Sequence, residues 1–490
     1  MKYLWILIAV FMFVPVFADT DIEPDDGDVE VTDDYADEEE LPDEDFSLEE
    51  DGAGLSITTA VNGSTVIYGR VFYNYITDYS RGRIYIYEQI GETGEFAFAG
   101  QIPSDREKTS YFGGYVGMSE NTIFTLNAIY GSGTTNEKQL DIYKKGEESV
   151  WSHNKTVELP ENYGVTGKGF AADNGNVLLP VYNTVINDKS IPELFLYSSD
   201  DDYVLYKSIA PANYDKDLYG FSFPMGFDIS DNTIVATSTS MIDEFTYGPT
   251  SIHIFSKDPE SGEWAETQTI KSDSGDLVKA YYNISIFKDR FMVHSYLDEN
   301  LTQGSAQIFQ NREGTWELVK EILPPADAKN HFGYNVSMGD VFAVATDKAD
   351  SKSLPFGTTY VFYKDYDPAN PDTKTEDNWG LFDKYEVTDE SVTPLMGSVA
   401  VIDGDTLSMG AAPTILKSGD PMTPYIEKLK TPEFTETPDE TETPDETEVN
   451  DEKETTDDAK TDDSDSAEET ADTENNDKKE KSSGCSVMVF

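Results

Sequence analysis

One structural unit recurs seven times between Gly54 and Pro413. Each copy has a glycine-containing or small opener, an alternating apolar strand, a tight polar turn and a second strand, followed by a loop and another strand pair. The glycines of the best openers, from Gly113 to Gly397, are about 57 residues apart on average, which indicates one supersecondary unit repeated in space. The openers are Phe112-Gly113, Tyr163-Gly164, Tyr219-Gly220, Phe332-Gly333 and Met396-Gly397, with degenerate versions at Gly54-Leu55 and Tyr281-Tyr282.

The clearest copy spans residues 331–363. Its first strand is expected over 331–338 and its second over 341–346, and both alternate with period two around Gly339-Asp340, the signal of a β-hairpin. A third strand is expected over 359–363. A fourth strand with an aromatic residue follows in most copies, at Phe96, Trp151, Tyr203, Trp264, Trp316 and Trp379.

Four antiparallel strands cannot bury their apolar face alone, so the units must pack face to face around an axis. The sequence therefore predicts an all-β fold, a seven-bladed β-propeller of four-stranded antiparallel blades flanked by disordered acidic arms. A linear β-solenoid is the alternative, but it uses shorter coils and parallel strands.

The repeat resembles the FG-GAP family, which builds the seven-bladed propeller at the head of integrin α subunits and of many exported proteins. The resemblance covers about residues 54–430. It implies a propeller and a role in adhesion or ligand binding. The matching residues are Phe332-Gly333, Val336, Met338, Gly339-Asp340, and residues 399–407 running into Gly410-Ala411-Ala412-Pro413.

The fourth strand of the last blade has two candidates. Phe434 lies at a suitable distance, but Pro432 and Pro438 flank it, and proline is excluded from interior strands. The other candidate, residues 45–49, would close the ring by bringing the N-terminal part of the chain to the last blade. This second candidate is preferred, and it predicts that deletion of residues 42–50 lowers the melting temperature.

The regions outside the repeat differ sharply from it in composition. Residues 1–18 read as a signal peptide, because an apolar run after Lys2 ends at Ala18. Residues 19–53 hold nineteen acids and no base, and residues 431–484 hold twenty-two acids and five bases. Such segments cannot bury a core, so we expect a disordered arm and a stalk on either side of a propeller at residues 54–430.

These features predict a protein that is secreted or held at the cell surface. No further transmembrane segment is expected, and the net charge of −60 disfavours binding to nucleic acid. The only cysteine, Cys485, lies in a short, largely apolar segment, residues 485–490, which is similar to the start of a surface-anchoring signal but has no long hydrophobic tail. Cys485 is therefore a candidate anchor. A monomer is expected.

No cofactor is expected. In integrin-type repeats, calcium is held by an Asp-x-Asp-x-Asp-Gly loop between the first two strands. Here that turn has only two or three residues, and the pairs Asp403 with Asp405 and Asp228 with Asp231 lack a third acid at the required spacing. The acidic loop 347–350 is typical of solvated loop residues. Calcium remains a candidate only outside the family's own site.

Catalytic patterns are not found in the sequence. The four histidines fall in different blades with no metal-ligand spacing, and no nucleophile elbow or phosphate loop occurs. His253 lies within a strand and is expected to be structural. The sequence predicts a non-catalytic binding or adhesion protein with a protein or glycan partner.

Loop tyrosines are the candidate partner-binding residues, because they are expected between second and third strands rather than in the core. They are Tyr73, Tyr75, Tyr79, Tyr130 and Tyr247. Two alternatives stay open. One is a propeller-type polysaccharide hydrolase or lyase, which would show a buried carboxylate pair in the channel with perturbed titration. The other is a structural component of a surface coat.

Overall fold

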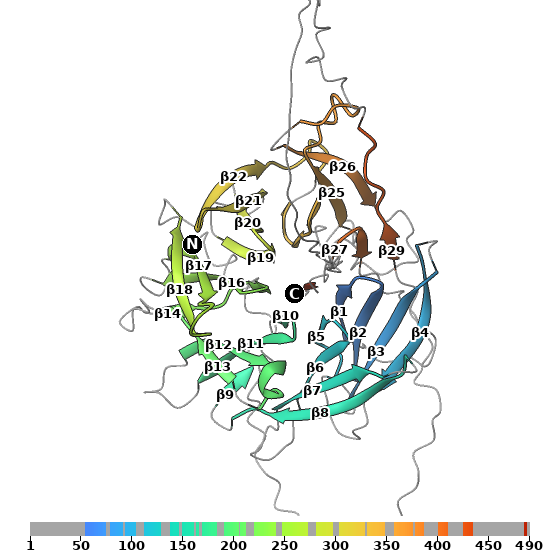
Figure 1. Ribbon diagram of the computed structural model, residues 1–490, viewed down its shortest axis with the longest axis vertical. Coiled ribbons are helices and arrows are strands. Elements are labelled where there is room, and N and C mark those ends of the chain that lie inside the picture. The colour runs from blue at the N-terminus through green and yellow to red at the C-terminus, as the bar shows by residue number, and fades with distance from the viewer. Residues whose placement is uncertain are drawn as a thin grey trace, which may run out of the picture. The chain divides into compact units, whose positions relative to one another are not determined.

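The chain forms a seven-bladed β-propeller in the computed structural model (Figure 1). Each blade is an antiparallel sheet, and the blades surround a common axis. The structure describes residues 54–74, 79–91, 94–103, 112–128, 138–146, 149–160, 163–165, 169–183, 191–204, 206–211, 220–241, 247–272, 281–296, 303–328, 331–347, 357–375, 378–386, 400–409, 425–434 and 485–487.

The first four blades begin at β1 and end at β18. They contain β1 (Gly54–Asn62), β2 (Thr65–Asn74), β3 (Tyr79–Ile90) and β4 (Glu95–Pro103); β5 (Val116–Ser119), β6 (Thr122–Ala128), β7 (Lys138–Lys145) and β8 (Trp151–Glu158); β9 (Tyr163–Val165), β10 (Ala171–Asp173), β11 (Asn176–Asn183), β12 (Ile191–Ser198) and β13 (Tyr206–Ile209); and β14 (Gly220–Ser222), β15 (Phe227–Ser230), β16 (Thr233–Met241), β17 (Tyr247–Lys257) and β18 (Trp264–Lys271).

The last three blades follow the same order. They contain β19 (Tyr281–Phe287), β20 (Arg290–Tyr296), β21 (Gly304–Arg312) and β22 (Thr315–Ile322); β23 (Val336–Met338), β24 (Phe342–Thr346), β25 (Thr358–Lys364) and β26 (Trp379–Glu386); and β27 (Ala400–Asp403), β28 (Thr406–Met409) and β29 (Tyr425–Lys428). A further strand, β30 (Cys485–Val487), pairs with β1. The single helical turn of the described residues is η1 (Ser199–Asp201).

Burial decreases from the inner strand of a blade to its outer strand. The inner strands β5, β10, β23 and β27 are buried at every residue, because other blades cover both of their faces. The outer strand β18 alternates between half-buried and exposed residues, as expected for a strand with one face in water. The apolar clusters bridge neighbouring blades, so Phe332 of blade six packs in one cluster with Met292 and Ile308 of blade five.

The Phe-Gly openers mark close contacts between blades. Gly113 and Gly333 have φ of +76° and +83°, a conformation that favours glycine. The backbone of each opener lies on a glycine of the preceding blade. An ideal Cβ on Gly82 would stand 1.4 Å from the Phe112 carbonyl oxygen, and one on Gly304 would stand 2.0 Å from the Phe332 carbonyl oxygen. The opener therefore precedes the strand, and β23 begins only at Val336 rather than at 331.

Blades three and four differ from the expected pattern. The fourth strand of blade three begins at Tyr206, while Tyr203 has a φ of +57° and packs edge-on against Phe124 of blade two. Two short strands, β9 and β14, add a partner to the second strands β11 and β16. The Tyr163-Gly164 and Tyr219-Gly220 openers thus lead into extra strands, a feature that a simple four-strand repeat does not predict.

Blade seven closes the ring by packing against blade one. Three strands of this blade are described, and Ser408 of β28 bonds to Tyr68 of β2 (2.7 Å) and to Thr59 of β1 (3.0 Å). Phe434 packs on Tyr363 with ring centroids 6.1 Å apart. The preferred closing segment, residues 45–49, lies outside the described residues, so it stays a prediction.

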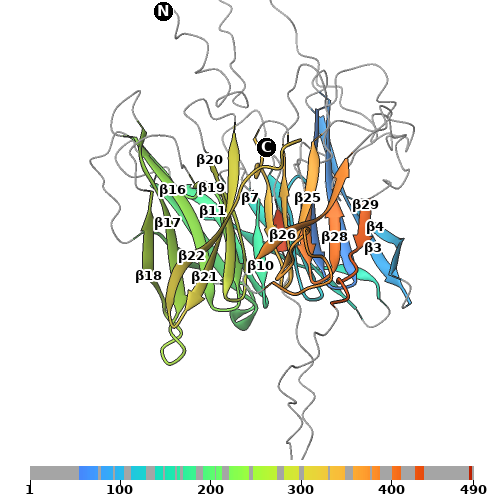
Figure 2. The ribbon, with the colours of Figure 1, turned by 90° about the horizontal axis from the view of Figure 1, so that it is seen from above.

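The two faces of the ring differ in their connections (Figure 2). First and second strands are joined by two residues in six blades and by three in blade six, whereas second and third strands are joined by four to fifteen residues. We call the side of the short first hairpins the turn face. The opposite side, with the second-to-third and blade-to-blade connections, is the connection face. Within the described residues, no helix has the length and apolar character to cross a bilayer.

Candidate functional site

The inner strands are tied together by side chains that accept hydrogen bonds from the next blade. In blade three, the Asp173 carboxylate accepts from the Asp231 backbone N–H of blade four at 2.5 Å. The same pattern recurs at other blade boundaries, between Ser119 and Gly175, Asp228 and Ile286, Ser230 and Lys288, Ser285 and Met338, Ser337 and Ile402, and Asp403 and Gly63. Short acceptors at these positions satisfy backbone donors that the blade's own sheet leaves unpaired.

Three of these acceptors are buried aspartates on the turn-face half of the inner strands. Asp173, Asp228 and Asp403 are 1–2% exposed. Burial raises the pKa of Asp173 to about 7, and the nearby Asp231 and Asp403 add to this effect against the backbone bonds that lower it. Burial likewise raises the pKa of Asp228 to about 7, with a further contribution from Asp173.

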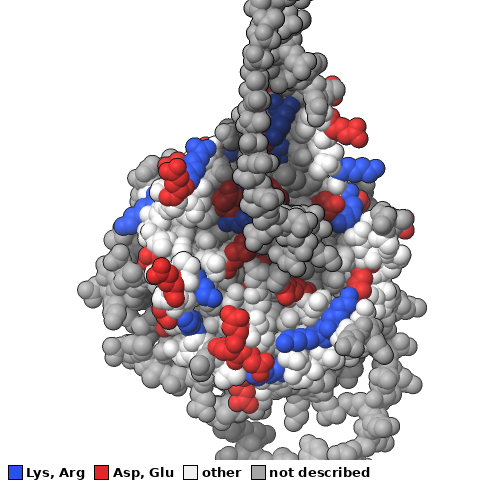
Figure 3. All heavy atoms as spheres, in the orientation of Figure 1, with Lys and Arg blue, Asp and Glu red and all other residues white. Residues whose placement is uncertain are grey.

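The inner strands therefore carry two buried carboxyl groups whose pKa is raised to about 7 by burial. Acidic atoms also gather around the centre of the ring on the face seen in Figure 3. Yet each buried carboxylate is already engaged by a backbone N–H of the next blade, as expected for a structural role. No group of three or more acids, histidines or cysteines within the described residues could hold a metal ion, and the candidate calcium pairs lie in these hairpins.

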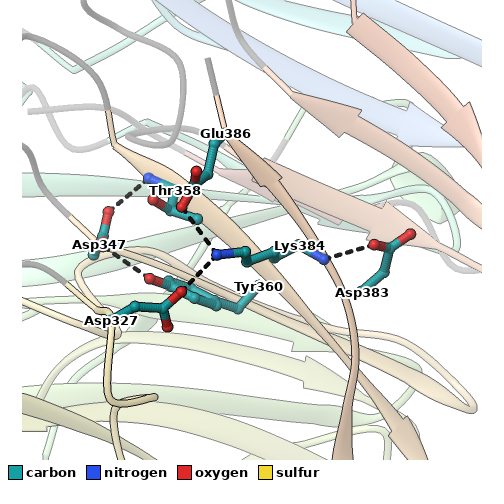
Figure 4. Close-up of polar contacts among 7 residues, drawn as sticks. All are labelled: Asp327, Asp347, Thr358, Tyr360, Asp383, Lys384 and Glu386. Carbon is teal, nitrogen blue, oxygen red and sulfur yellow. Dashed lines mark hydrogen bonds and ion pairs between the residues drawn. The ribbon is translucent and has the colours of Figure 1, made fainter. Parts of the chain in front are cut away.

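A second polar cluster lies on the connection face of blade six (Figure 4). Lys384 of β26 contacts Asp327 at 2.5 Å and Glu386 at 3.2 Å, and the bond from Lys384 lowers the pKa of the Asp327 carboxyl. Beside it, Asp347 accepts from the Thr358 N–H at 2.6 Å and from the Tyr360 hydroxyl at 3.1 Å. Asp347 is 0% exposed, so the expectation of a solvated acidic loop at 347–350 is wrong for this residue.

Asp347 is expected to stabilise blade six strongly. Asp347→Ala leaves two buried donors of Thr358 and Tyr360 without this acceptor, which costs on the order of 2–3 kcal/mol. We expect a clear fall in the urea midpoint of unfolding. Asp327→Ala is the control on the same face, because its side chain is exposed, and it should leave the midpoint unchanged. Equal midpoints for Asp347→Ala and the native protein would contradict this role.

His153 and His253 form hydrogen bonds to side chains of their own or adjacent strands. His253 bonds to Ser238 and to Glu266, both at 2.8 Å, which confirms the structural expectation. The structure also brings His294 and His331 close to each other across the boundary of blades five and six. Burial, with a smaller contribution from His331, lowers the pKa of His294 to about 3, so His294 is neutral at pH 7. The sequence positions alone did not indicate this proximity.

The predicted partner-binding tyrosines share the connection face where they are described. Tyr73 and Tyr79 lie in the paired ends of β2 and β3, and Tyr247 begins β17, so these three stand in strands rather than in loops. Tyr75 and Tyr130 lie outside the described residues. Cys485, the candidate anchor, begins β30 and stands opposite Val61 of β1. The binding and anchoring roles of these residues remain predictions.

Comparisons with known proteins show no family for this chain. No protein-family model matches the sequence, and no curated protein matches it. The β-propeller domain of the Trilobed protease from Pyrococcus furiosus is 10% identical, with 77% of this chain and 96% of that domain covered and a TM-score of 0.43. Acylaminoacyl peptidase from Pyrococcus horikoshii is 10% identical, with 78% of this chain and 53% of that protein covered and a TM-score of 0.45.

A protein of unknown function from Dyadobacter fermentans is also similar. It is 10% identical, with 66% of this chain and 96% of that protein covered and a TM-score of 0.38. This chain therefore spans about half the length of the peptidase and nearly all of the other two structures. Similarities at this level carry no statement about family or function, and the seven-bladed propeller is defined by the sheets of this structure itself.

Proposed function

We propose that this protein is an exported, non-catalytic recognition protein that binds a protein or glycan partner through its connection face. The observation that carries the proposal is the contrast between the two faces. First hairpins of two or three residues lie on the turn face together with third-to-fourth connections of two to fourteen residues. The connection face carries every second-to-third connection, of four to fifteen residues, and the blade-to-blade connections. Variable connections on a rigid scaffold are where proteins place binding residues.

The engagement of the channel acids supports a binding role over a catalytic one. Asp173, Asp228 and Asp403 each accept a backbone N–H from the next blade, at 2.5 to 2.9 Å. A general acid or base must instead reach the substrate proton directly or through one water. These carboxylates are held by the scaffold, so their buried position serves blade assembly.

The Phe-Gly openers support membership of the FG-GAP type of repeat. The openers at Phe112 and Phe332 place glycine at positive φ against the preceding blade. This packing explains why a Phe-Gly pair recurs at the start of a blade. A secreted or cell-surface location rests on the apolar run of residues 4–14 and on the acidic composition of both flanks.

A screen of glycan and protein arrays tests this function, run beside a broad screen for hydrolase and lyase activity. We expect at least one specific binder and no turnover. Turnover of a polysaccharide with no array binder would overturn the proposal.

A polysaccharide hydrolase or lyase is the second candidate, and one observation favours it. Asp173 and Asp228 are buried carboxyls with pKa raised to about 7, the state expected of a general acid. If the protein cleaves glycans, Asp173→Asn and Asp228→Asn must each lower kcat at least about a hundredfold. An unchanged kcat in both variants would exclude these residues as the catalytic pair.

A further inference from the structure

The inner edge of β1 carries an added strand. Residues Cys485–Val487 pair antiparallel with it, with Cys485 opposite Val61, Ser486 opposite Ala60 and Val487 opposite Thr59. Blade one thereby becomes a five-stranded sheet with β30 at its inner edge, at the centre of the ring (Figure 1). Strand addition of this kind satisfies backbone groups that an edge strand otherwise leaves open.

Blade one is suited to accept this strand because its inner strand is the longest. Among the described inner strands, β1 has nine residues and β19 has seven, whereas β5, β15 and β27 have four, and β10 and β23 have three. Beyond β1, β30 lies against the inner strands β5, β10 and β27 of three other blades. The residues that face it in register, Thr59, Ala60 and Val61, are fully buried.

Small residues occur on the inner strands around β30. Ala60, Ala171, Ala172 and Ala400 are 0% exposed, and their side chains pack into the apolar clusters between neighbouring blades.

The direction of the chain allows β30 to reach β1. Each third strand ends on the turn face, so the end of β29 and the residues that follow it to Phe434 lie on that face. Because β30 runs antiparallel to β1, its first residue, Cys485, also lies toward the turn face. Fifty residues join Phe434 to Cys485, and a random coil of that length would have a root-mean-square span of roughly 40 Å.

Charge also favours this segment as the occupant. Residues 482–490 carry no charged side chain, while the preceding residues 478–481 are Lys-Lys-Glu-Lys. An uncharged strand can enter between the inner strands without placing a charge beside the buried aspartates.

We propose that the inner edge of β1 is a binding site for an extended peptide and that the protein's own segment Cys485–Val487 occupies it in cis. The acidic stalk is then a tether, which holds the segment at an effective concentration on the order of a millimolar. Three residue pairs alone would bind weakly, since each backbone bond contributes about 1 kcal/mol. Docking and lipid attachment at Cys485 exclude each other, so the site would control exposure of the candidate anchor.

Disulfide trapping tests the register in the full chain. Directly opposite residues of antiparallel strands have Cα atoms about 4.5–5.5 Å apart, within the range of a disulfide. Val61→Cys should therefore form an internal disulfide with Cys485, the chain's only cysteine. Val66→Cys is the matched control, because Val66 is equally buried in the same cluster but stands one strand farther away, about 10 Å from Cys485.

The readout is retention of residues 482–490 after trypsin cuts the stalk. We expect mass spectrometry to find the peptide attached to the Val61→Cys protein until reduction, at least about tenfold more than for Val66→Cys. Equal retention in both variants, or release in both, would overturn the proposal, and a disulfide-linked dimer would assign the site to a second copy. If Val61→Cys does not fold, the same retention assay is run on Thr59→Cys combined with Val487→Cys in a Cys485→Ser background. Thr59 and Val487 are also directly opposite each other, so a disulfide between them tests the same register.

Discussion

Gly82→Ala is expected to lower the free energy of unfolding by more than about 3 kcal/mol, or to prevent folding. Its new Cβ would stand 1.4 Å from the Phe112 carbonyl oxygen, a backbone atom that cannot move without separating blades one and two. Gly304→Ala should behave in the same way at the boundary of blades five and six, where the contact is 2.0 Å. Urea unfolding followed by tryptophan fluorescence measures both.

Gly100→Ala is the matched control for these variants. Gly100 also lies in a strand of blade one, but nothing stands within 4 Å of an added Cβ. Its free energy of unfolding should change by less than about 1 kcal/mol. A Gly82→Ala protein that unfolds at the same urea concentration as Gly100→Ala would show that the Phe-Gly opener does not hold the blades together.

The native protein is expected to lose stability as the pH rises and Asp173 gives up its proton, and Asp173→Asn should abolish this loss. The pKa of Asp173 is about 7 in the folded protein and about 3.8 unfolded, so the folded state binds the extra proton between these values. Stability from this group is therefore full below pH 3.8 and is lost as the pH rises through 7. Between pH 5 and pH 8, the stability of Asp173→Asn relative to the native protein should rise by on the order of 2–3 kcal/mol.

Ser119→Ala separates the charge of Asp173 from its role as an acceptor. Ser119 occupies the equivalent position at the end of the inner strand of blade two and accepts from Gly175. Its loss should cost about 1 kcal/mol at both pH values, because no titrating group is removed. Urea titrations at pH 5 and pH 8 avoid the isoelectric point of about 4.1. The same difference at both pH values for Asp173→Asn would contradict a raised pKa.

Local patterns in the sequence predicted the parts of the fold that depend on neighbouring residues. The period-two strands around Gly339-Asp340 and the third strands with Tyr85 and Tyr197 are present as expected, because a hairpin is specified by its own turn and alternation. The aromatic side chain of Tyr203 predicts a fourth strand at this position. The structure uses it as a turn residue that reaches the preceding blade.

The channel could not be predicted because its contacts join residues from separate blades. Asp173 and Asp231 are 58 residues apart, and no short pattern distinguishes an inter-blade acceptor from a solvated turn acid. The sequence nevertheless contains a signal for these contacts. The residue that ends the inner strand is serine or aspartate in several blades, as at Ser119, Asp173, Ser230 and Asp403, and an acceptor repeated at one register position indicates a shared partner.

Partner binding by the connection face is most directly tested by the affinity of an array-identified ligand for two variants. One carries serine at Tyr73, Tyr75, Tyr79, Tyr130 and Tyr247, and the other carries serine at the exposed turn-face residues Ile90, Val150 and Val204. We expect the first to bind at least about tenfold more weakly and the second to bind like the native protein, with melting temperatures confirming that both are folded. Weaker binding only in the turn-face variant would contradict the account.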